Sequence, residues 1–521
     1  MRCFIERPKS LYALLEHAGH IHPDGTALVC GDVRLSYHQL IESTARLAGG
    51  FARLGIKKGD RIALLLANRV EFVTALFATA RLGAIAVPIS IREQAPGLAF
   101  MLGQCQAVAV LHEADLAGRL PGVDATRDLR HRISMGPCPG SIEFSELMAD
   151  PPLDRVAEVA EEDTAALLYT SGTTGRPKGA MLTHLGIAHS AIHFRVAMGL
   201  SAADSTVAAV PLSHVTGLVA LIATFVHCAG KLVIMPAFKA GAYLDIAARE
   251  RITHSLLVPA MYNLCLIEPG FGEQDLSAWR VGAYGGAPMP VATISALAAK
   301  LPGLTLMNCY GSTETTSPAT LMPQGATATH NDTVGRALPC AQLCVMDDEG
   351  CELPRGALGE IWIRGPMVVP GYWDNPDATR ANFTAGFWRS GDIGSIDEQG
   401  YVRVVDRKKD MINRGGYKIY TIEVENALYQ HAAVLECAVV ARACPVLGER
   451  VHAFVCLRDG AVTEQALRAH CSERLSDYKV PETFTLQNQP LPRNANGKLL
   501  KREMRDSLSD AGPVQLLGAH R

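Results

Sequence analysis

The stretch "LLYTSGTTGRPKGAMLTH", from Leu167 to His184, places small polar residues and glycines between two apolar segments. The run from Thr164 to Thr170 is short and apolar, which predicts a buried strand. The residues after the glycines predict an approach to a helix and then a helix, with Thr183 as its N-cap. The sequence therefore predicts a glycine-rich turn that leads from a strand into a helix.

The chemistry of this turn suits a polyphosphate. Its glycines permit positive φ angles and a close approach of the backbone to a ligand, and consecutive N–H groups can form an anion-binding nest. It is not a Walker A loop, because Arg176 and Pro177 separate the last glycine of the run from Lys178. The alternative is a flexible surface loop of this composition. The residues expected to contact a nucleotide are Thr170, Ser171, Gly172, Thr173, Thr174, Gly175 and Lys178.

Composition narrows the class of protein. The chain has 521 residues, 48% of them hydrophobic, which is enough for two to four domains. Its net charge of −3 gives no basic field, so we expect no nucleic-acid partner. Fourteen cysteines without a C-x-x-C pair indicate a reducing, cytoplasmic environment. The longest apolar run, 215–230, is short for a membrane span and predicts a buried helix.

The order of apolar runs predicts an α/β protein. Strand-like runs at 61–68, 84–90, 254–260, 279–288 and 304–314 alternate with helical patterns such as 71–83. From 335 to 405 the pattern changes to short strands and turns, which predicts a small β subdomain. The charged stretch 406–416 has the composition of a linker. A compact α+β domain follows, with a helix capped by Thr463.

Four further motifs complete a family pattern. They are "YGSTE" (310–314), "SGD" (390–392), "DRKKD" (406–410) and "PRNANGK" (492–498). Together with the first stretch they resemble the adenylate-forming superfamily of acyl-CoA synthetases, luciferases and adenylation domains of peptide synthetases, over nearly the full length. The resemblance implies a large N-terminal domain of layered α/β subdomains with a β subdomain, residues 1–407, and a small mobile α+β domain, residues 408–521.

The resemblance implies an ATP and Mg²⁺ site. In the family, the residue matching Tyr310 lies near adenine, that matching Thr313 meets the α-phosphate, and that matching Glu314 binds magnesium. Asp392 matches the aspartate that accepts both ribose hydroxyls, and Arg407 matches an arginine that contacts ribose and phosphate. The remaining nucleotide-site residues by this resemblance are Gly286, Ala287, Pro288, Asn308 and Gly311.

The acid site is less determined. The family often places a histidine or an aromatic residue at the position of His214, where it controls access to the thioester site. Amino-acid-activating relatives carry an aspartate in this segment, which "SHVTG" lacks, so we expect an acid without an α-amino group. Tyr284 stands where small residues are common, and we expect it to crowd or stack in the pocket. The residues expected to line the acyl pocket are Val215, Thr216, Gly217, Gly285 and Cys309, which favour an uncharged hydrophobic acid.

Two half-reactions are expected to share one site. Lys498 matches the family lysine that drives adenylation, where a cation relieves the repulsion between a carboxylate and the α-phosphate. Gly415 and Gly416 match the segment that faces the pantetheine arm of coenzyme A. Because both faces belong to the small domain, that domain is expected to rotate about Lys409, the family's hinge position.

The sequence thus predicts an ATP-dependent acid–thiol ligase that forms an acyl-AMP and then an acyl-CoA from a fatty or aryl acid. Loading of a carrier-protein phosphopantetheine, luciferase-type oxidation and a nucleotide-binding pseudoenzyme are the alternatives. The residues that speak against a pseudoenzyme are Lys178, Thr313, Glu314, Asp392, Arg407 and Lys498. We expect no membrane span, and the assembly state, including a homodimer, is left open.

Overall fold

The computed structural model describes residues 2–122, 125–170, 176–458, 462–493 and 499–509. The chain forms two compact units. The larger unit contains Met1–Cys344, Trp362–Ser390 and Ile396–Arg403, and the smaller contains Val345–Ile361, Gly391–Ser395 and Val404–Arg521. A large N-terminal and a small C-terminal part are as predicted, while the boundary between residues 407 and 408 stays a prediction.

A nine-stranded sheet forms one half of the larger unit, in the order β16-β15-β14-β13-β12-β10-β11-β1-β2. Its central strands are parallel, and β2, β15 and β16 are antiparallel to their neighbours at the two edges. The strands are β1 (Thr26–Cys30), β2 (Val33–Ser36), β10 (Ser205–Ala208), β11 (Lys231–Ile234), β12 (His254–Leu257), β13 (Val281–Gly285), β14 (Thr305–Tyr310), β15 (Thr320–Leu321) and β16 (Arg336–Ala337).

A seven-stranded sheet forms the other half, in the order β7-β6-β5-β3-β4-β8-β9. All neighbours are parallel except β8 and β9. The strands are β3 (Arg61–Leu65), β4 (Ile85–Pro88), β5 (Ala107–Glu113), β6 (His131–Met135), β7 (Ile142–Glu143), β8 (Thr164–Thr170) and β9 (Lys178–Thr183).

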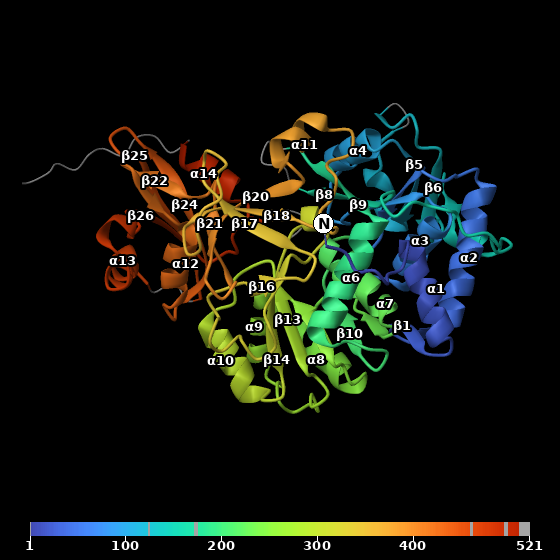
Figure 1. Cartoon of the computed structure of the whole chain (residues 1–521), viewed down its shortest axis with the longest axis horizontal. Helices are drawn as coiled ribbons and strands as arrows, with labels where there is room; N and C mark the ends of the chain where they lie inside the picture. The colour runs from blue at the N-terminus through green and yellow to red at the C-terminus, as the bar shows by residue number, and fades with distance from the viewer. Residues whose placement is uncertain (1, 123–124, 171–175, 459–461, 494–498, 510–521) are drawn as a thin grey trace, which may run out of the picture. The chain divides into compact units, whose positions relative to one another are not determined.

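Helices cover both faces of both sheets (Figure 1). One core cluster joins the two sheets through the helices between them, which are α1 (Leu11–Ile21), α2 (Tyr37–Arg53), α3 (Val70–Arg81), α6 (His184–Met198), the π-helix η3 (Thr216–Ala223) and α7 (Thr224–His227). The outer face of the nine-stranded sheet packs on α8 (Ala240–Arg249), α9 (Pro259–Ile267) and α10 (Val291–Lys300). The outer face of the seven-stranded sheet packs on α4 (Ala95–Gln104) and η1 (Ala114–Arg119). The result is five layers, as expected for strands that are apolar on both faces.

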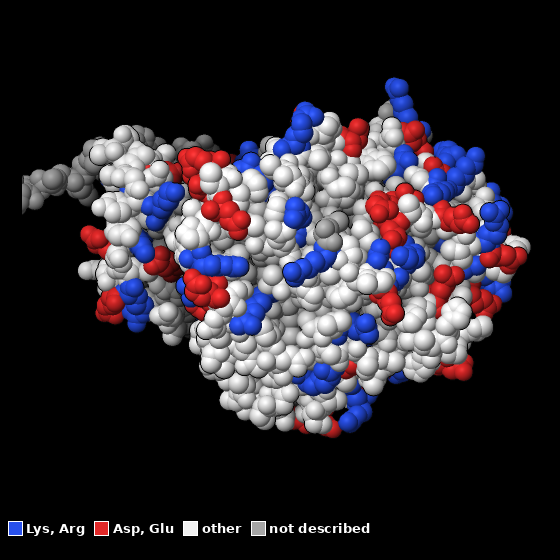
Figure 2. Space-filling model, viewed as in Figure 1, with Lys and Arg blue, Asp and Glu red and all other residues white. Residues whose placement is uncertain are grey.

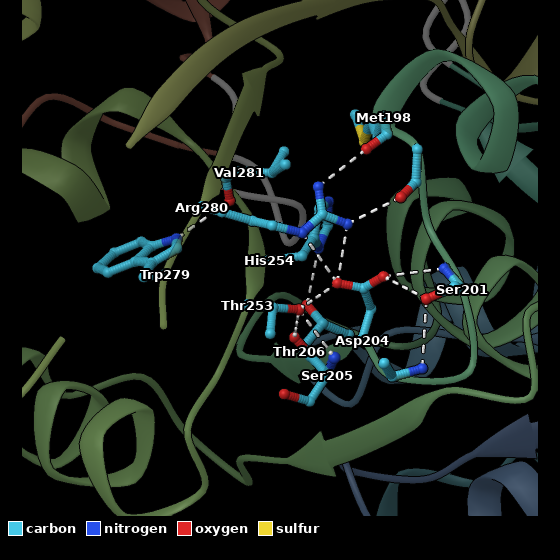
Figure 3. A network of polar contacts seen from close by, with 12 residues as sticks. Met198, Ser201, Asp204, Ser205, Thr206, Thr253, His254, Trp279, Arg280 and Val281 are labelled. Atoms are coloured by element: carbon cyan, nitrogen blue, oxygen red, sulfur yellow. Dashed lines mark hydrogen bonds and ion pairs between the residues drawn. The ribbon is translucent and has the colours of Figure 1, made fainter. Parts of the chain in front are cut away.

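A polar network joins the end of α6 to the starts of β10, β12 and β13 (Figure 3). Asp204 pairs with Arg280 at 2.8 Å and accepts a hydrogen bond from the Thr253 hydroxyl at 2.7 Å. Arg280 also donates to the carbonyl of Gly199, the left-handed C-cap of α6. Burial alone would raise the pKa of Asp204, but the hydrogen bonds and the arginine outweigh it and lower that pKa. Asp204 is therefore a paired anion that joins the starts of β10, β12 and β13 at one end of the sheet.

The structure corrects the predicted strand-to-helix turn. Residues Lys178–Thr183 form β9, which pairs antiparallel with β8 in a register that places Thr170 opposite Lys178. The helix begins only at His184, where the Thr183 hydroxyl caps it by accepting from the Gly186 N–H, as predicted. The glycine-rich stretch therefore connects two neighbouring antiparallel strands. The apolar residues of "KGAMLT" are consecutive, and so short an apolar run does not distinguish a strand from the approach to a helix.

The smaller unit contains a five-stranded sheet, in the order β23-β22-β25-β24 with β26 beside β25. One face packs on α12 and α13, and α14 packs on the other. The Thr463 hydroxyl caps α13 as predicted. The elements are β22 (Ile412–Arg414), β23 (Tyr417–Ile419), α12 (Thr421–Tyr429), β24 (Val434–Cys444), β25 (Gly448–Leu457), α13 (Glu464–Ser472), η5 (Asp477–Lys479), β26 (Thr483–Gln487) and α14 (Lys501–Ser509).

The predicted β subdomain is a five-stranded sheet whose strands supply residues to both units. Its strands are β17 (Gln342–Met346), β18 (Gly359–Arg364), β19 (Phe383–Thr384), β20 (Phe387–Ile396) and β21 (Val402–Arg407). The short elements not yet named are α5 (Phe144–Met148), η4 (Thr313–Thr315) and α11 (Pro376–Asn382).

The surface carries both signs of charge. On the face shown in Figure 2, acidic and basic side chains are interspersed. Within the described residues, no helix combines the length and the hydropathy that a membrane span needs.

Candidate functional site

The carboxylate of Glu314 is the centre of the candidate site. It is buried directly after β14, in η4, and three hydroxyl groups surround it. Ser312 donates to its Oε2 at 2.5 Å, and Tyr372 donates to its Oε1 at 2.9 Å. The Thr170 hydroxyl, at the end of β8, lies 3.4 Å from the same Oε1. Two predicted residues, Thr170 and Glu314, are therefore brought together across 144 residues of chain.

Lys178 contacts the same tyrosine through the face of its ring. Its ammonium is 5.1 Å from the centre of the tyrosine ring, within the range of a cation–π contact. Burial lowers the pKa of Lys178, and the nearby Glu314 carboxylate partly offsets this. Burial and the same carboxylate raise the pKa of the Tyr372 hydroxyl, so it remains a neutral donor. The predicted loop residues Ser171, Gly172, Thr173, Thr174 and Gly175 lie outside the described residues.

The turn after Glu314 adopts an uncommon backbone conformation. Thr316 and Ser317 have φ angles of 49° and 36°, in the left-handed region. For a β-branched residue such as threonine this is an outlier, and such outliers cluster at functional sites. Thr313 opens η4 and is half-buried. A side chain at Gly311 would meet the Thr315 hydroxyl at 3.0 Å, which accounts for the glycine there.

Strands β13 and β14 deliver the segment expected to line the adenine and acyl pockets. Gly285 pairs with Cys309, and a Cβ on Gly285 would come within 2.5 Å of the Cys309 carbonyl oxygen. Gly286 has a φ of 78°, which favours glycine. The following Ala287 and Pro288 are exposed, whereas Tyr310, which ends β14, is half-buried.

Two residues of these strands have structural contacts. Asn308 is buried and donates to the Thr333 carbonyl at 3.2 Å. Tyr284 packs with Tyr262 and Trp279 in the core cluster on the outer face of the nine-stranded sheet, which we call the outer cluster. Cys309 belongs to the cluster between the two sheets, the inner cluster. The expectation that Tyr284 crowds or stacks in the pocket is therefore wrong. Successive strand residues point to opposite faces, so Tyr284 points away from the face that Gly285 shares with Cys309.

In the smaller unit, Asp392 and Arg407 form an ion pair. Asp392 is buried in β20, and its Oδ1 lies 2.7 Å from Nε of Arg407, whose side chain is partly exposed at the end of β21. The preceding Gly391 has a φ of 68°, and its N–H donates to Glu360 at 3.2 Å. The turn of the "SGD" motif is thus fixed by its own glycine and a carboxylate of β18.

The segment that carries His214 is held by a residue that the sequence analysis missed. Asn68, buried at the end of β3, accepts from the Leu212 N–H at 2.9 Å. Its amide group donates to the carbonyls of Val210 at 2.9 Å and of Met235 at 3.1 Å. A polar residue at the end of the apolar run 62–67 was the signal that could have identified it.

The residues predicted to line the acyl pocket come directly after this segment in the sequence. His214, Val215 and Thr216 are half-buried, and Thr216 opens the π-helix η3. A π-helix inside a helical run is uncommon and often marks a functional site. A Cβ on Gly217 would lie 2.3 Å from the Pro211 carbonyl oxygen, so the turn requires glycine at this position. The predicted buried helix is confirmed, but its π geometry was not predicted.

The residues expected to face coenzyme A, to form the hinge and to drive adenylation belong to the smaller unit. Gly415 and Gly416 form the two-residue turn between β22 and β23, with φ angles of 58° and 93°. Both angles favour glycine, as in type I′ hairpins. Lys409 is exposed in the turn after β21. Lys498 lies outside the described residues.

The charged stretch 406–416 is more ordered than its composition suggested. Asp406 is buried and accepts from the N–H and the hydroxyl of Thr421 at the start of α12. Lys408 pairs with Asp348 at 2.7 Å. The charges that indicated a linker are therefore largely paired.

The chemistry of Glu314 fits magnesium. Among the residues that the structure describes, no group of three His, Cys, Asp or Glu is placed to hold a metal ion. A single buried carboxylate surrounded by hydroxyl oxygens suits Mg²⁺, which takes oxygen ligands and is usually held by one or two carboxylates together with substrate phosphates.

A cavity of about 730 Å³ lies in the larger unit, and neither Glu314 nor Lys178 lines it. Its charged lining residues are Arg69, Glu71, Glu113 and Asp115, and Arg69 pairs with Glu71 at 2.8 Å and with Glu113 at 2.7 Å. Asn68 also lines it.

Comparison with known proteins assigns the family. The description "AMP-binding enzyme" matches residues 15–373, and "AMP-binding enzyme C-terminal domain" matches residues 423–498. A feruloyl-CoA synthase from Amycolatopsis is 34% identical, over 93% of this chain and 96% of the relative. The long-chain-fatty-acid–CoA ligase FadD13 from Mycobacterium tuberculosis is 34% identical, over 92% of this chain and 95% of the relative. The structure of the anthranilate CoA ligase AuaEII with anthranoyl-AMP has a TM-score of 0.91 and 25% identity, and covers 98% of this chain and 100% of that chain.

The chain therefore belongs to the AMP-binding enzyme family, in the acyl-CoA synthetase branch of the adenylate-forming superfamily.

Proposed function

We propose that this enzyme uses ATP and Mg²⁺ to convert a hydrophobic carboxylic acid, fatty or aryl, into an acyl-adenylate, and then transfers the acyl group to coenzyme A. The observation that carries the proposal is the buried Glu314 carboxylate, which faces three hydroxyl groups and shares Tyr372 with the ammonium of Lys178. A buried carboxylate that can hold a metal ion and a buried ammonium that can bind phosphate suit a metal-bound polyphosphate, and Thr170 and Lys178 flank the glycine-rich stretch in the sequence.

In the first half-reaction, a carboxylate oxygen of the acid attacks the α-phosphorus of ATP and the bond to pyrophosphate breaks. Magnesium, when bound, neutralises phosphate charge, and Glu314 would hold it. Lys178 binds the phosphate groups, and the Thr313 hydroxyl donates to an α-phosphate oxygen. Lys498 bridges the acid and the α-phosphate, where it stabilises the charge that develops in the transition state.

Asp392 and Arg407 bind the ribose in this proposal. A buried carboxylate accepts from vicinal hydroxyls in bidentate geometry, and the 2.7 Å contact with Arg407 orients it. Tyr310 and the backbone of Gly286, Ala287 and Pro288 line the adenine site.

The acid occupies the inner side of β13 and β14 and the start of η3. Cys309 lies in the inner core cluster, and Val215 packs against that same cluster. These side chains carry no formal charge, which favours an uncharged tail. The named relatives include a feruloyl-CoA synthase and a long-chain-fatty-acid–CoA ligase, so both aryl and aliphatic acids belong in the test. His214 controls access of the thiol to this site.

In the second half-reaction, the thiol of coenzyme A attacks the acyl carbonyl and AMP leaves. We place the pantetheine arm against the glycine turn at Gly415 and Gly416, whose exposed backbone allows a close approach. The smaller unit reorients about Lys409 between the two half-reactions. All fourteen cysteines are free thiols, which fits an enzyme of the cytoplasm.

A screen for pyrophosphate release tests the proposal. The purified enzyme is supplied with MgATP and a panel of fatty, cinnamic, benzoic, dicarboxylic and amino acids, with and without free coenzyme A. We expect release with at least one hydrophobic monocarboxylic acid, and an acyl-CoA product when coenzyme A is present. Adenylate formation without thioester would instead indicate a carrier protein as the acceptor. No release with any acid would contradict the function.

A further inference from the structure

Tyr372 contacts two groups of opposite charge. Its hydroxyl donates to Glu314 Oε1 at 2.9 Å, and the Lys178 ammonium sits 5.1 Å from its ring centre. Both charged side chains are buried, with 6% and 8% of their surface exposed. Within the described residues, no ion pair joins Lys178 and Glu314. One aromatic side chain thus contacts the cation with its face and the anion with its hydroxyl.

The backbone around Tyr372 fixes this placement. Residues 371–373 run beside β9, where Tyr372 forms a bridge with Ala180 and the Trp373 N–H donates to the Gly179 carbonyl at 2.8 Å. The Tyr372 N–H donates to the hydroxyl of Thr379 at 3.0 Å. Because β9 begins at Lys178, the same strand positions both the lysine and the segment that carries the tyrosine.

Two opposite charges in a buried, poorly hydrated region attract each other strongly, since the local dielectric constant is low. If they met, each would neutralise the other, and neither would be available to a ligand. The face of the tyrosine ring lies against the Lys178 ammonium, and its hydroxyl holds one Glu314 carboxylate oxygen in a defined orientation.

We propose that Tyr372 is a positioning residue that keeps the Lys178 ammonium and the Glu314 carboxylate apart and orients the carboxylate for the metal–nucleotide complex. This rests on the proposed function, in which Glu314 holds Mg²⁺ and Lys178 binds phosphate. The Tyr372 hydroxyl orients only the Glu314 carboxylate, whereas the ring contacts Lys178 and also carries the hydroxyl. Substitutions that remove the hydroxyl alone, or the hydroxyl and the ring, therefore separate the two roles.

Equilibrium binding of ATP tests the proposal without turnover. In the absence of an acid substrate, calorimetry measures the dissociation constant of ATP in Mg²⁺ and in EDTA. Tyr372→Phe keeps the ring and removes the hydroxyl. We expect the tightening of ATP binding by Mg²⁺ to fall about tenfold, because loss of a group that orients a metal ligand typically costs 10–100-fold in metal affinity. Binding in EDTA is expected to change less than about twofold, since the ring remains under Lys178.

Tyr372→Leu removes the ring as well. Lys178 and Glu314 can then form a direct ion pair, so ATP binding is expected to weaken in both Mg²⁺ and EDTA. Tyr169→Phe is the matched control, because the hydroxyl of this half-buried tyrosine contacts Gln104 and the Met101 carbonyl instead of the site. Tyr169→Phe should retain the wild-type ratio between the two conditions. Thermal unfolding of Tyr372→Phe is expected to match that of the control.

Glu314→Gln separates this inference from the function on which it rests. Loss of the Mg²⁺ effect in both Glu314→Gln and Tyr372→Phe supports the positioning role. Loss in Glu314→Gln with an unchanged ratio in Tyr372→Phe overturns the role of Tyr372 and leaves the metal assignment standing. An unchanged ratio in Glu314→Gln overturns the metal assignment itself, and the inference with it.

Discussion

Nε of Arg407 lies 2.7 Å from Oδ1 of Asp392, and the aspartate is buried while the arginine is partly exposed. The two residues come from β20 and β21, and the ion pair places a fixed carboxylate next to a charge that can still reach solvent. That arrangement suits a site in which the carboxylate accepts hydroxyl groups and the guanidinium contacts a phosphate.

The first prediction concerns Asp392→Asn. The amide keeps the shape but loses the charge and one acceptor, so it cannot accept from both ribose hydroxyls and pair with Arg407. Loss of a charge-assisted hydrogen bond costs about 1.5–3 kcal/mol, so ATP should bind about 10–100-fold more weakly. The KM for the acid should change much less.

Asp348→Asn is the control for this substitution. It breaks a surface ion pair of similar length, the 2.7 Å contact with Lys408, at a residue outside the proposed site. Wild-type ATP dependence in Asp392→Asn, or an equal loss in Asp348→Asn, would remove Asp392 from the nucleotide site.

The second prediction concerns Asn68→Asp. Aspartate keeps the acceptor for the Leu212 N–H but presents an oxygen to the carbonyls of Val210 and Met235, to which asparagine donates. The loss of these bonds and the new repulsion should displace the segment that leads to His214. We expect the KM for the acid to rise about tenfold or more, since a buried polar group left unpaired costs about 1–3 kcal/mol.

The ratio of two KM values distinguishes this role from general destabilisation. The KM for ATP should stay near its wild-type value, because Lys178 and Glu314 lie on other elements. Thr74→Val removes a buried hydroxyl that lines the same cavity as Asn68, and it should leave both KM values unchanged. Equal increases in both KM values for Asn68→Asp would assign Asn68 a purely structural role.

Much of the fold could be predicted from local pattern. The βαβ alternation, the caps at Thr183 and Thr463, and the β subdomain all follow from apolar periodicity and capping chemistry, which act over a few residues. The strand β9 was missed because a glycine-rich loop followed by a helix suggested a direct connection between strand and helix. Pairing with β8 is a tertiary contact that the local pattern does not specify.

The residues of the candidate site also differ in whether the local sequence could predict them. Glu314 and Asp392 lie in short motifs, whereas Tyr372 and Asn68 act through partners 58 and 144 residues away. Tyr284 shows the limit of motif comparison. Its position in the motif predicted a side chain in the acyl pocket. Because side chains alternate between the two faces along β13, Tyr284 instead packs in the core cluster on the outer face of the sheet.

The third prediction concerns pH and His254. Burial lowers the pKa of this imidazole to about 3, and the nearby Asp204 only partly offsets that. As the pH falls from 6.5 towards 3, the unfolded chain binds a proton that the folded chain does not, so folding stability is lost in that window. Each such histidine contributes up to about 1.4 kcal/mol per pH unit.

His254→Gln keeps a polar partner for the Thr206 hydroxyl, which lies 3.0 Å from Nδ1, and removes the titration. We expect the midpoint of thermal unfolding to fall less steeply between about pH 6.5 and pH 5 in this variant than in the wild type. His20→Gln, at an exposed position, should retain the wild-type slope. An unchanged slope in His254→Gln would show that His254 does not titrate differently on unfolding.

The last prediction concerns the hinge. Lys409 is exposed in the turn after β21, and within the part of the chain that the structure describes its N–H donates to no backbone carbonyl. Proline at this position fixes φ near −65° and disfavours a helical conformation at Lys408, so it restricts rotation without removing a contact. We expect Lys409→Pro to retain adenylate formation and lose most thioester formation, read in a single turnover as pyrophosphate release against acyl-CoA yield.

Lys498→Ala gives the reciprocal result if the smaller unit alternates. It should lose adenylate formation while converting preformed acyl-adenylate and coenzyme A to thioester, because its charge serves only the attack on the α-phosphate. Substitution at Gly416 is a less clean test of the thiol path, since its φ of 93° strains any other residue. If Lys409→Pro retains full thioester formation, or if Lys498→Ala loses both half-reactions equally, the two half-reactions do not depend on rotation about Lys409.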